Sequence, residues 1–250
     1  TAVYYTNTPD IVAPIRSARL INTRLTQQYD AALINSGGSD PVRWQLSQLP
    51  IVNLDEYFHP KPYFYREGEG WQRRLAVNAA QAHRYMQDKG LQAPVALRGF
   101  AFDPSPPSGD PVETIYIDYP AKQNKALWQF NPQTNLFERY NAGEPMLDGA
   151  TEQIIAVPNV IIYFAPHTDT DIVEDSNGAT SIDINVDGEG EAWVFRDGIV
   201  IKGRWRTGGH QTPEFVSPDN RPIPLRPGST WIQVVPTDYE ILVNRLPGDE

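Results

Sequence analysis

The first hundred residues alternate short apolar runs with stretches of helical periodicity. Residues 2–5 are mostly β-branched or aromatic, which predicts a strand. A helix is predicted from Pro14 onward, because apolar side chains recur every three or four residues, at Ile15, Ala18, Ile21, Leu25 and Tyr29. Arg16 and Arg19 fall outside this apolar stripe, three residues apart on one side of the predicted helix.

A glycine-rich turn joins the next strand and helix. The apolar run 31–34 predicts a short buried strand, which ends at Asn35-Ser36-Gly37-Gly38-Ser39. Ser39 or Asp40 can cap the helix that follows, with Pro41 in its first turn. The sequence therefore predicts a strand-to-helix turn whose backbone amides are free to meet a ligand.

The same alternation continues to residue 90. Residues 63–66 predict a strand, and residues 76–89 predict a helix that stops at Gly90. Strands alternating with helices indicate an α/β layer with a short, mostly parallel sheet. In such sheets ligands bind at the carboxyl ends of the strands.

Beyond a proline-rich segment at 102–111, the pattern changes to strands alone. Strands are predicted at 114–119, 127–130, 136–140, 159–165, 181–186, 191–196, 199–205, 230–235 and 240–243. Asp197-Gly198 predicts a tight hairpin turn between two of them. We therefore expect an α+β protein with an α/β domain at 1–105 and a mainly antiparallel β domain at 110–250.

Charge and composition exclude several classes of protein. The formal net charge is -10, from 21 Lys and Arg against 31 Asp and Glu, which disfavours a nucleic-acid partner. No apolar run reaches the roughly 18 residues of a transmembrane helix. Without cysteine the chain has no disulfide and no thiolate nucleophile or ligand. No cofactor is expected.

Several motifs resemble, in order, the YerB-like family of bacterial lipoproteins, a domain of unknown function (3048). Residues 13–19, Ala-Pro-Ile-Arg-Ser-Ala-Arg, resemble its G-P-[IV]-R-S-A-R motif, and the family's G-G-S turn matches Gly37-Gly38-Ser39. In the second half the similar segments are Asn159-Val160-Ile161-Ile162, Gly188-Glu189-Gly190-Glu191-Ala192, Phe195-Arg196-Asp197-Gly198, Gly203-Arg204-Trp205 and residues 223–232.

The resemblance implies a two-domain bacterial protein of the cell envelope, either tethered to the membrane or secreted. It implies a further segment ahead of residue 1, and a lipid-anchor cysteine would lie upstream of Thr1. One family pattern, R-x-x-P-H-N, is only partly kept here, where Arg73 and Asn78 remain and the Pro and His are replaced. Chemistry that rests on that histidine is therefore not expected in this chain.

The candidate ligand site is the glycine-rich turn. Successive amides of Gly37, Gly38 and Ser39 at a helix start can hold an anion, and Arg16 with Arg19 could clamp a carboxylate or phosphate. The full candidate set is Arg16, Ser17, Arg19, Gly37, Gly38, Ser39, Arg66, Arg73 and Asn78. The structural alternative is that the glycines only make a sharp turn and that Arg16 pairs with an acidic residue.

Other groups of residues are weaker candidates for a functional site. The serines and the four histidines are not patterned as a catalytic triad, and Asp55, Glu56 or Asp40 could act as carboxylates in glycoside hydrolysis. The acidic run at 167–177 departs from an EF-hand loop and predicts a polar loop between strands, with no metal site. Trp193, Trp205 and Trp231 could stack on sugars, although alternation within strands favours core packing.

Three functions remain open. The first is a non-catalytic extracellular protein that binds an anionic or cell-wall-derived ligand at the turn. The second is a hydrolase of an envelope polymer. The third is a structural or assembly protein that self-associates through exposed sheet edges.

Overall fold

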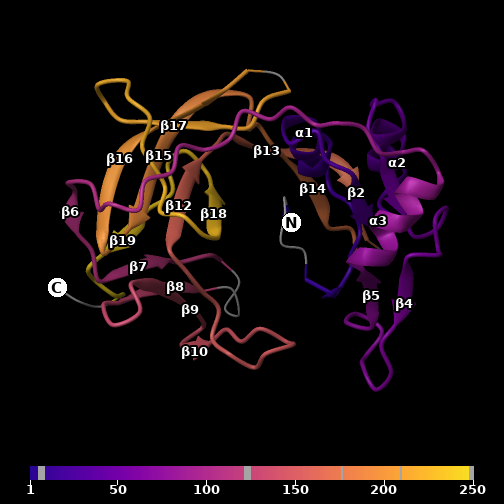
Figure 1. The fold of residues 1–250 in the computed structure, drawn as a ribbon, viewed down its shortest axis with the longest axis horizontal. Coiled ribbons are helices and arrows are strands. Elements are labelled where there is room, and N and C mark those ends of the chain that lie inside the picture. The colour runs from indigo at the N-terminus through magenta and orange to yellow at the C-terminus, as the bar shows by residue number, and fades with distance from the viewer. Residues whose placement is uncertain (5–8, 121–124, 176, 209, 248–250) are drawn as a thin grey trace. The chain divides into compact units, whose positions relative to one another are not determined.

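The computed structural model describes residues 1–4, 9–120, 125–175, 177–208 and 210–247. Within these residues the chain has three α-helices, all before residue 90, and is otherwise built from strands (Figure 1). This confirms the expected α+β class. None of the helices in the described ranges is long and apolar enough to cross a membrane.

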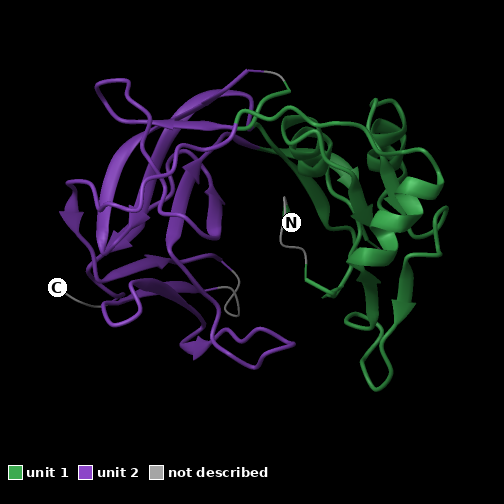
Figure 2. Ribbon diagram, in the orientation of Figure 1, with its two compact units in different colours: residues 1–98, 168–185, 209–212 green, residues 99–167, 186–208, 213–250 purple. Residues whose placement is uncertain are grey.

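The chain forms two compact units (Figure 2). Unit 1 comprises Thr1–Arg98, Thr168–Asn185 and Gly209–Thr212, and unit 2 comprises Gly99–His167, Val186–Gly208 and Pro213–Glu250. The segment 168–185 comes from the middle of the range that the sequence assigns to the second domain, yet it completes unit 1.

Unit 1 combines the helices with short strands. Its helices are α1 (Leu20–Gln28), α2 (Asp40–Ser47) and α3 (Ala79–Asp88). Its strands are β1 (Ile11–Val12), β2 (Leu33–Asn35), β3 (Asn53–Asp55), β4 (Tyr63–Tyr65), β5 (Leu75–Asn78), β13 (His167–Val173) and β14 (Thr180–Ile184).

In unit 1, β2 and β3 pair in parallel, with Leu33 opposite Asn53. The three-stranded sheet β1-β5-β4 is antiparallel throughout, so the expected mostly parallel sheet is not what forms. The helical pattern at 76–89 divides into a strand and a helix. Leu75, Ala76 and Val77 are buried in β5, and α3 begins only at Ala79.

The first predicted helix starts later than its periodicity indicates. Residues 13–19 are not helical because their backbone groups bond elsewhere: Ile15 N–H donates to Leu75 O at 2.9 Å, and Ala18 N–H donates to Gly37 O at 2.9 Å. Tertiary pairing thus overrides local propensity here. The predicted strand at 2–5 is absent from residues 2–4, and Tyr5 lies outside the described residues.

The β13–β14 hairpin packs within unit 1. Ile172 of β13 lies against the apolar cluster of Ala18, Leu20, Leu33, Val42 and Leu46. The Arg24 guanidinium donates to both carboxylate oxygens of Asp183 at 3.0 Å. The expectation of a polar loop at 167–177 is therefore wrong for residues 167–173, which form a strand.

Unit 2 is built from two sheets. The first follows the order β10-β9-β8-β7-β19, with β11 beside β9, and contains β7 (Thr114–Ile117), β8 (Ala126–Asn131), β9 (Leu136–Asn141), β10 (Glu144–Pro145), β11 (Ala156–Val157) and β19 (Ile241–Val243). The second follows the order β17-β16-β15-β12-β18, with β6 beside β16, and contains β6 (Asp110–Pro111), β12 (Asn159–Phe164), β15 (Gly188–Arg196), β16 (Ile199–Thr207), β17 (Glu214–Val216) and β18 (Thr230–Val235).

Both sheets contribute to one apolar core, in which Ile115, Trp128 and Phe137 of the first sheet pack with Val160 and Phe195 of the second. The pairing between the described strands of unit 2 is antiparallel as expected, except that β12 and β18 run parallel, as does an isolated bridge between Phe102 and Leu225. The predicted hairpin is confirmed: Arg196 pairs with Ile199, and the two turn residues Asp197 and Gly198 have φ of 51° and 69°.

Candidate functional site

The turn between β2 and α2 forms where the sequence predicts it. Gly37 has φ of 68°, a conformation that favours glycine, and a Cβ at Gly38 would lie 3.3 Å from the Ala18 carbonyl oxygen. Ser39 is the N-cap residue of α2, yet its side chain makes no capping hydrogen bond. Its buried Oγ has no hydrogen-bond partner among the described residues.

An internal carboxylate already occupies this turn. Asp55, at the carboxyl end of β3, accepts the Gly37 N–H at 3.0 Å and the Tyr57 N–H at 3.1 Å through the same oxygen. Its other oxygen lies 3.8 Å from Nε of Arg43, and its side chain is only 3% exposed. The Gly37 amide, which could have met an external anion, therefore binds Asp55.

Arg16 and Arg19 do not form the expected clamp. Arg16 donates to the Gln72 carbonyl at 3.0 Å and lies over the Trp71 ring. Arg19 pairs instead with Glu174 at 3.2 Å, a carboxylate of the β13–β14 segment whose side chain is 5% exposed. Because residues 13–19 are not helical, the prediction that both arginines share one helix side is wrong.

Three segments that carry the other candidate residues do come together. Ser36 N–H donates to Arg16 O at 3.1 Å, which sets the exposed Ser17 beside the turn, and Ile15 binds Leu75 just after Arg73. Arg66 donates to the Arg73 carbonyl at 2.9 Å and lies 3.6 Å from Glu69. Asn78 caps α3, accepting the Gln81 N–H at 2.9 Å.

Beside the turn lies a group of exposed rings and arginines, here called the aromatic–arginine surface. The rings of Tyr57, Phe58, Tyr65 and Trp71 are 77%, 65%, 57% and 71% exposed. Each has an arginine over it: Arg43 over Tyr57 and Phe58, Arg74 over Tyr65, and Arg16 over Trp71, with guanidinium carbons 4.8–5.6 Å from the ring centroids. Such stacking is favourable for arginine in particular.

Glu56 joins this surface to the turn. One oxygen accepts the Ser36 hydroxyl at 3.1 Å, and the other accepts the Tyr65 hydroxyl at 3.0 Å. The hydrogen bond to this carboxylate raises the pKa of Tyr65 above its usual value, so the hydroxyl stays protonated and keeps donating. Within the described residues, the guanidinium groups of Arg73 and Arg74 make no hydrogen bond, which leaves their donors open to a ligand.

Sequence reasoning missed these rings. Their signal is that large aromatic residues stand in turns among charged and glycine residues, as in Glu56-Tyr57-Phe58-His59-Pro60 and Gly70-Trp71-Gln72. A turn offers no core to bury such rings in, so their exposure could have been anticipated.

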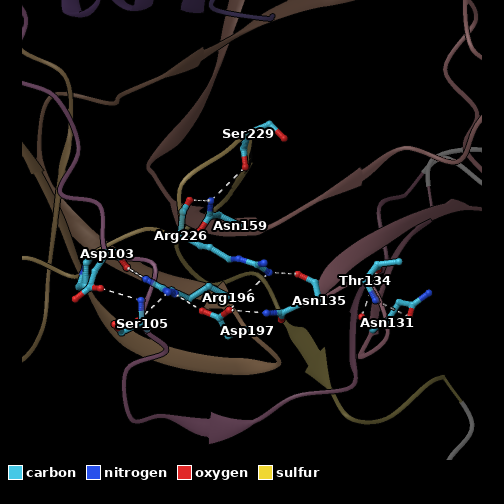
Figure 3. A network of polar contacts seen from close by, with 11 residues as sticks. Asp103, Ser105, Asn131, Thr134, Asn135, Asn159, Arg196, Asp197, Arg226 and Ser229 are labelled. Atoms are coloured by element: carbon cyan, nitrogen blue, oxygen red, sulfur yellow. Dashed lines mark hydrogen bonds and ion pairs between the residues drawn. The ribbon is translucent and has the colours of Figure 1, made fainter.

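Three of the motifs of the carboxy-terminal half, those that contain Asn159, Arg196 and Arg226, meet in one buried polar network of unit 2 (Figure 3). The Arg196 side chain is fully buried and donates to Asp197 at 2.6 Å, to Pro224 O at 2.9 Å and to Ser105 O at 3.0 Å. Asn159 binds the backbone of Arg226 in both directions at 2.8 Å. Since protein acceptors satisfy the Arg196 donors, this network holds the strands together and offers no ligand site.

The three tryptophans considered as a sugar platform belong to the core of unit 2. Trp205 is 1% exposed and donates to Phe164 O at 2.7 Å. Trp193 and Trp231 are partly buried against the main apolar cluster. The prediction of core packing is confirmed.

Comparison with known proteins identifies the family. Models described as "Protein of unknown function (DUF3048) N-terminal domain" and "Protein of unknown function (DUF3048) C-terminal domain" match residues 1–93 and 115–232. "Putative lipoprotein YerB" of Bacillus subtilis (strain 168) is 24% identical over 245 residues, which cover 94% of this chain and 70% of that protein. The crystal structure of YerB from Bacillus subtilis matches with a TM-score of 0.79 at 21% identity, over 95% of this chain and 78% of that chain, and shows the same fold. The resemblance drawn from the motifs is thus confirmed, and the chain belongs to the DUF3048 family, of which it carries both domains.

Proposed function

We propose that this chain is an extracytoplasmic protein of the bacterial cell envelope that binds an anionic, cell-wall-derived ligand on the aromatic–arginine surface of unit 1. The envelope location rests on the similarity to a protein named as a lipoprotein. The binding role rests on one observation: four exposed rings are each overlaid by an arginine, although the chain as a whole is acidic. Exposed aromatic groups of this extent usually mark interaction sites.

We propose that the ligand binds beside the glycine-rich turn and not inside it. Asp55 fills the position that an external anion would take at Gly37, and it also holds Tyr57 and lies close to Arg43. Asp55 therefore connects the turn to two residues of the aromatic–arginine surface, Tyr57 and Arg43. Arg16, Arg73 and Arg74 supply the positive charge that recognises carboxylate or phosphate groups, with Arg66 next to them.

Hydrolysis fits this surface less well than binding. A glycosidase needs two carboxyl groups that both reach the substrate. Asp55 is buried with one oxygen engaged by two amides, and both oxygens of Glu56 accept hydroxyl groups. The two carboxylates next to the turn therefore act as supports for neighbouring side chains.

The test is co-sedimentation with purified insoluble cell walls from a Gram-positive bacterium. The double variant Arg16→Ala/Arg74→Ala should bind at least about tenfold more weakly, as expected when two charge-assisted contacts of at least 1 kcal/mol each are lost. The matched control is Arg221→Ala/Arg245→Ala, which removes two exposed arginines of unit 2 and should bind normally. Equal binding by both variants, or no binding by the unaltered protein at low salt, would refute the proposal.

A further inference from the structure

We infer that the ligand is an acidic glycan whose sugar rings stack on the exposed faces of Tyr57, Phe58, Tyr65 and Trp71. This inference rests on the proposed function and names the chemical class of its ligand. An anion alone needs only the arginines. The four exposed rings require a ligand that also has flat, weakly polar faces, as pyranose rings do.

The rings are held in place, which suits them to binding. The Tyr57 backbone is fixed by Asp55, the Tyr65 hydroxyl by Glu56, and the Trp71 ring by the Arg16 guanidinium above it. Arg16 is in turn anchored to the carbonyl of Gln72, next to Trp71. Because the side chains of Tyr65 and Trp71 are already restrained, stacking a sugar on them costs less conformational entropy than stacking on free side chains.

A continuous chain of contacts connects the rings. Trp71 contacts Arg16, whose carbonyl accepts the Ser36 amide, and the Ser36 hydroxyl binds Glu56. Glu56 binds Tyr65 and directly precedes Tyr57 in the chain. These contacts join the segments that carry the four rings, and an extended polymer that follows these segments can contact several of the rings.

The polar groups between the rings match an acidic saccharide. Arginine donors can bind sugar hydroxyl and carboxylate oxygens, and the guanidinium groups of Arg73 and Arg74 make no hydrogen bond within the described residues. A membrane surface fits less well, because each of the four rings lies under a guanidinium group, and that charge would enter the apolar part of the membrane together with the ring.

The experiment measures the affinity of the whole protein for three probes by titration calorimetry. The first is glycan strands freed from peptidoglycan by an amidase, which keep their sugar rings. The second is poly-L-glutamate, a polyanion without sugar rings, and the third is phosphatidylglycerol vesicles. The glycan should bind most tightly, and the vesicles should not bind.

Two pairs of variants separate stacking from charge. Trp71→Ala/Phe58→Ala should lower glycan affinity roughly tenfold, the loss expected for two aromatic contacts, and should leave poly-L-glutamate binding unchanged. Trp71→Tyr/Phe58→Tyr keeps flat rings and should restore most of the glycan affinity. The matched control, Trp44→Ala/Phe102→Ala, removes rings that are 66% and 53% exposed outside this surface and should have no effect.

The outcomes distinguish this inference from the function on which it rests. If cell walls and poly-L-glutamate bind as tightly as the glycan, and the ring variants lose nothing, the proposed function stands and the glycan inference is wrong. If vesicles bind most tightly, the surface is a membrane contact and the inference is likewise wrong. If neither walls nor glycan bind, both proposals fail.

Discussion

Tyr63 shows how a single partly buried polar side chain joins separate elements of unit 1. From β4 its hydroxyl reaches the last carbonyls of the parallel pair, Asn35 O of β2 at 3.2 Å and Leu54 O of β3. It thereby links the antiparallel sheet to the strands that carry the turn and Asp55. Burial raises the pKa of the Tyr63 hydroxyl well above its usual value, because the phenolate would lose its solvation there.

The change Tyr63→Phe is therefore expected to destabilise the protein in a pH-dependent way. At pH 7 the loss should be about 1–2 kcal/mol, since the Asn35 and Leu54 carbonyls lose a buried donor. Unfolded tyrosine ionises near pH 10 and the folded residue only at higher pH. The stabilising contribution of Tyr63 is thus complete below about pH 10 and declines above it, so the two proteins should converge in alkaline solution.

Urea unfolding at pH 7 and at pH 10.8 measures this convergence. Tyr57→Phe is the matched control, because its exposed hydroxyl makes no hydrogen bond to a described residue and its removal should change stability little at either pH. If the free energies of unfolding of Tyr63→Phe and the unaltered protein differ by the same amount at both pH values, Tyr63 does not have a raised pKa in the folded protein.

At the scale of elements, the β15–β16 hairpin is fixed by its turn and by the charges behind it. Asp197 and Gly198 supply the two positive φ angles, and Asp197 accepts hydrogen bonds from Arg196 and Asn135. Arg196 also binds carbonyls at Ser105 and Pro224, which come from segments far apart in the sequence (Figure 3). The turn at Asp197-Gly198 can be recognised in the sequence, whereas the tertiary contacts around it cannot.

Replacing Arg196 by Met should destabilise unit 2 by about 3–5 kcal/mol, because it leaves the buried Asp197 carboxylate without its closest cation. Arg226, 3.7 Å from Asp197, compensates only in part. Arg221→Met, at a side chain that is 81% exposed, should cost well under 1 kcal/mol. Guanidinium chloride unfolding compares the two, and similar midpoints would show that the network carries little stability.

The sequence predicts the elements of unit 2 well because its strands obey a local rule. Apolar alternation and turn residues placed eight of its strands, and β18 was matched at both ends as Thr230–Val235. In unit 1 the local signal misleads. Residues 13–19 have helical spacing, but Ile15 and Ala18 bind Leu75 and Gly37 instead, and no local pattern reports such partners.

The candidate site shows the same limit. The turn at Gly37 and the N-cap position of Ser39 are visible in the sequence, because positive φ and helix starts have residue preferences. The sequence does not show that Asp55 binds the Gly37 amide, because this contact forms only when the ends of β2 and β3 lie side by side. Nor does it show the pairing of Arg19 with Glu174, whose residues lie 155 positions apart.

For the whole molecule, the assignment of residues 168–185 to unit 1 has a consequence for its folding. The amino-terminal family model ends at residue 93 and so omits this segment. Yet Ile172 covers the apolar cluster around Leu20 and Val42, Arg24 holds Asp183, and Arg19 holds Glu174. Without this segment, residues 1–98 keep only two small sheets, β1-β5-β4 and β2-β3, and so small a chain is expected to be only marginally stable once these contacts are removed.

The isolated fragment 1–98 is therefore expected not to fold cooperatively. Heating should give a broad, shallow loss of circular dichroism, and its apolar cluster should bind the dye ANS. The comparison is a chain in which residues 168–185 are replaced by a Gly/Ser linker within the full protein. There unit 2 should keep a sharp transition, because its core uses none of these residues, while the signals of unit 1 should broaden as in the fragment. If fragment 1–98 melts sharply at the temperature of the intact protein, residues 168–185 are not needed for the folding of unit 1.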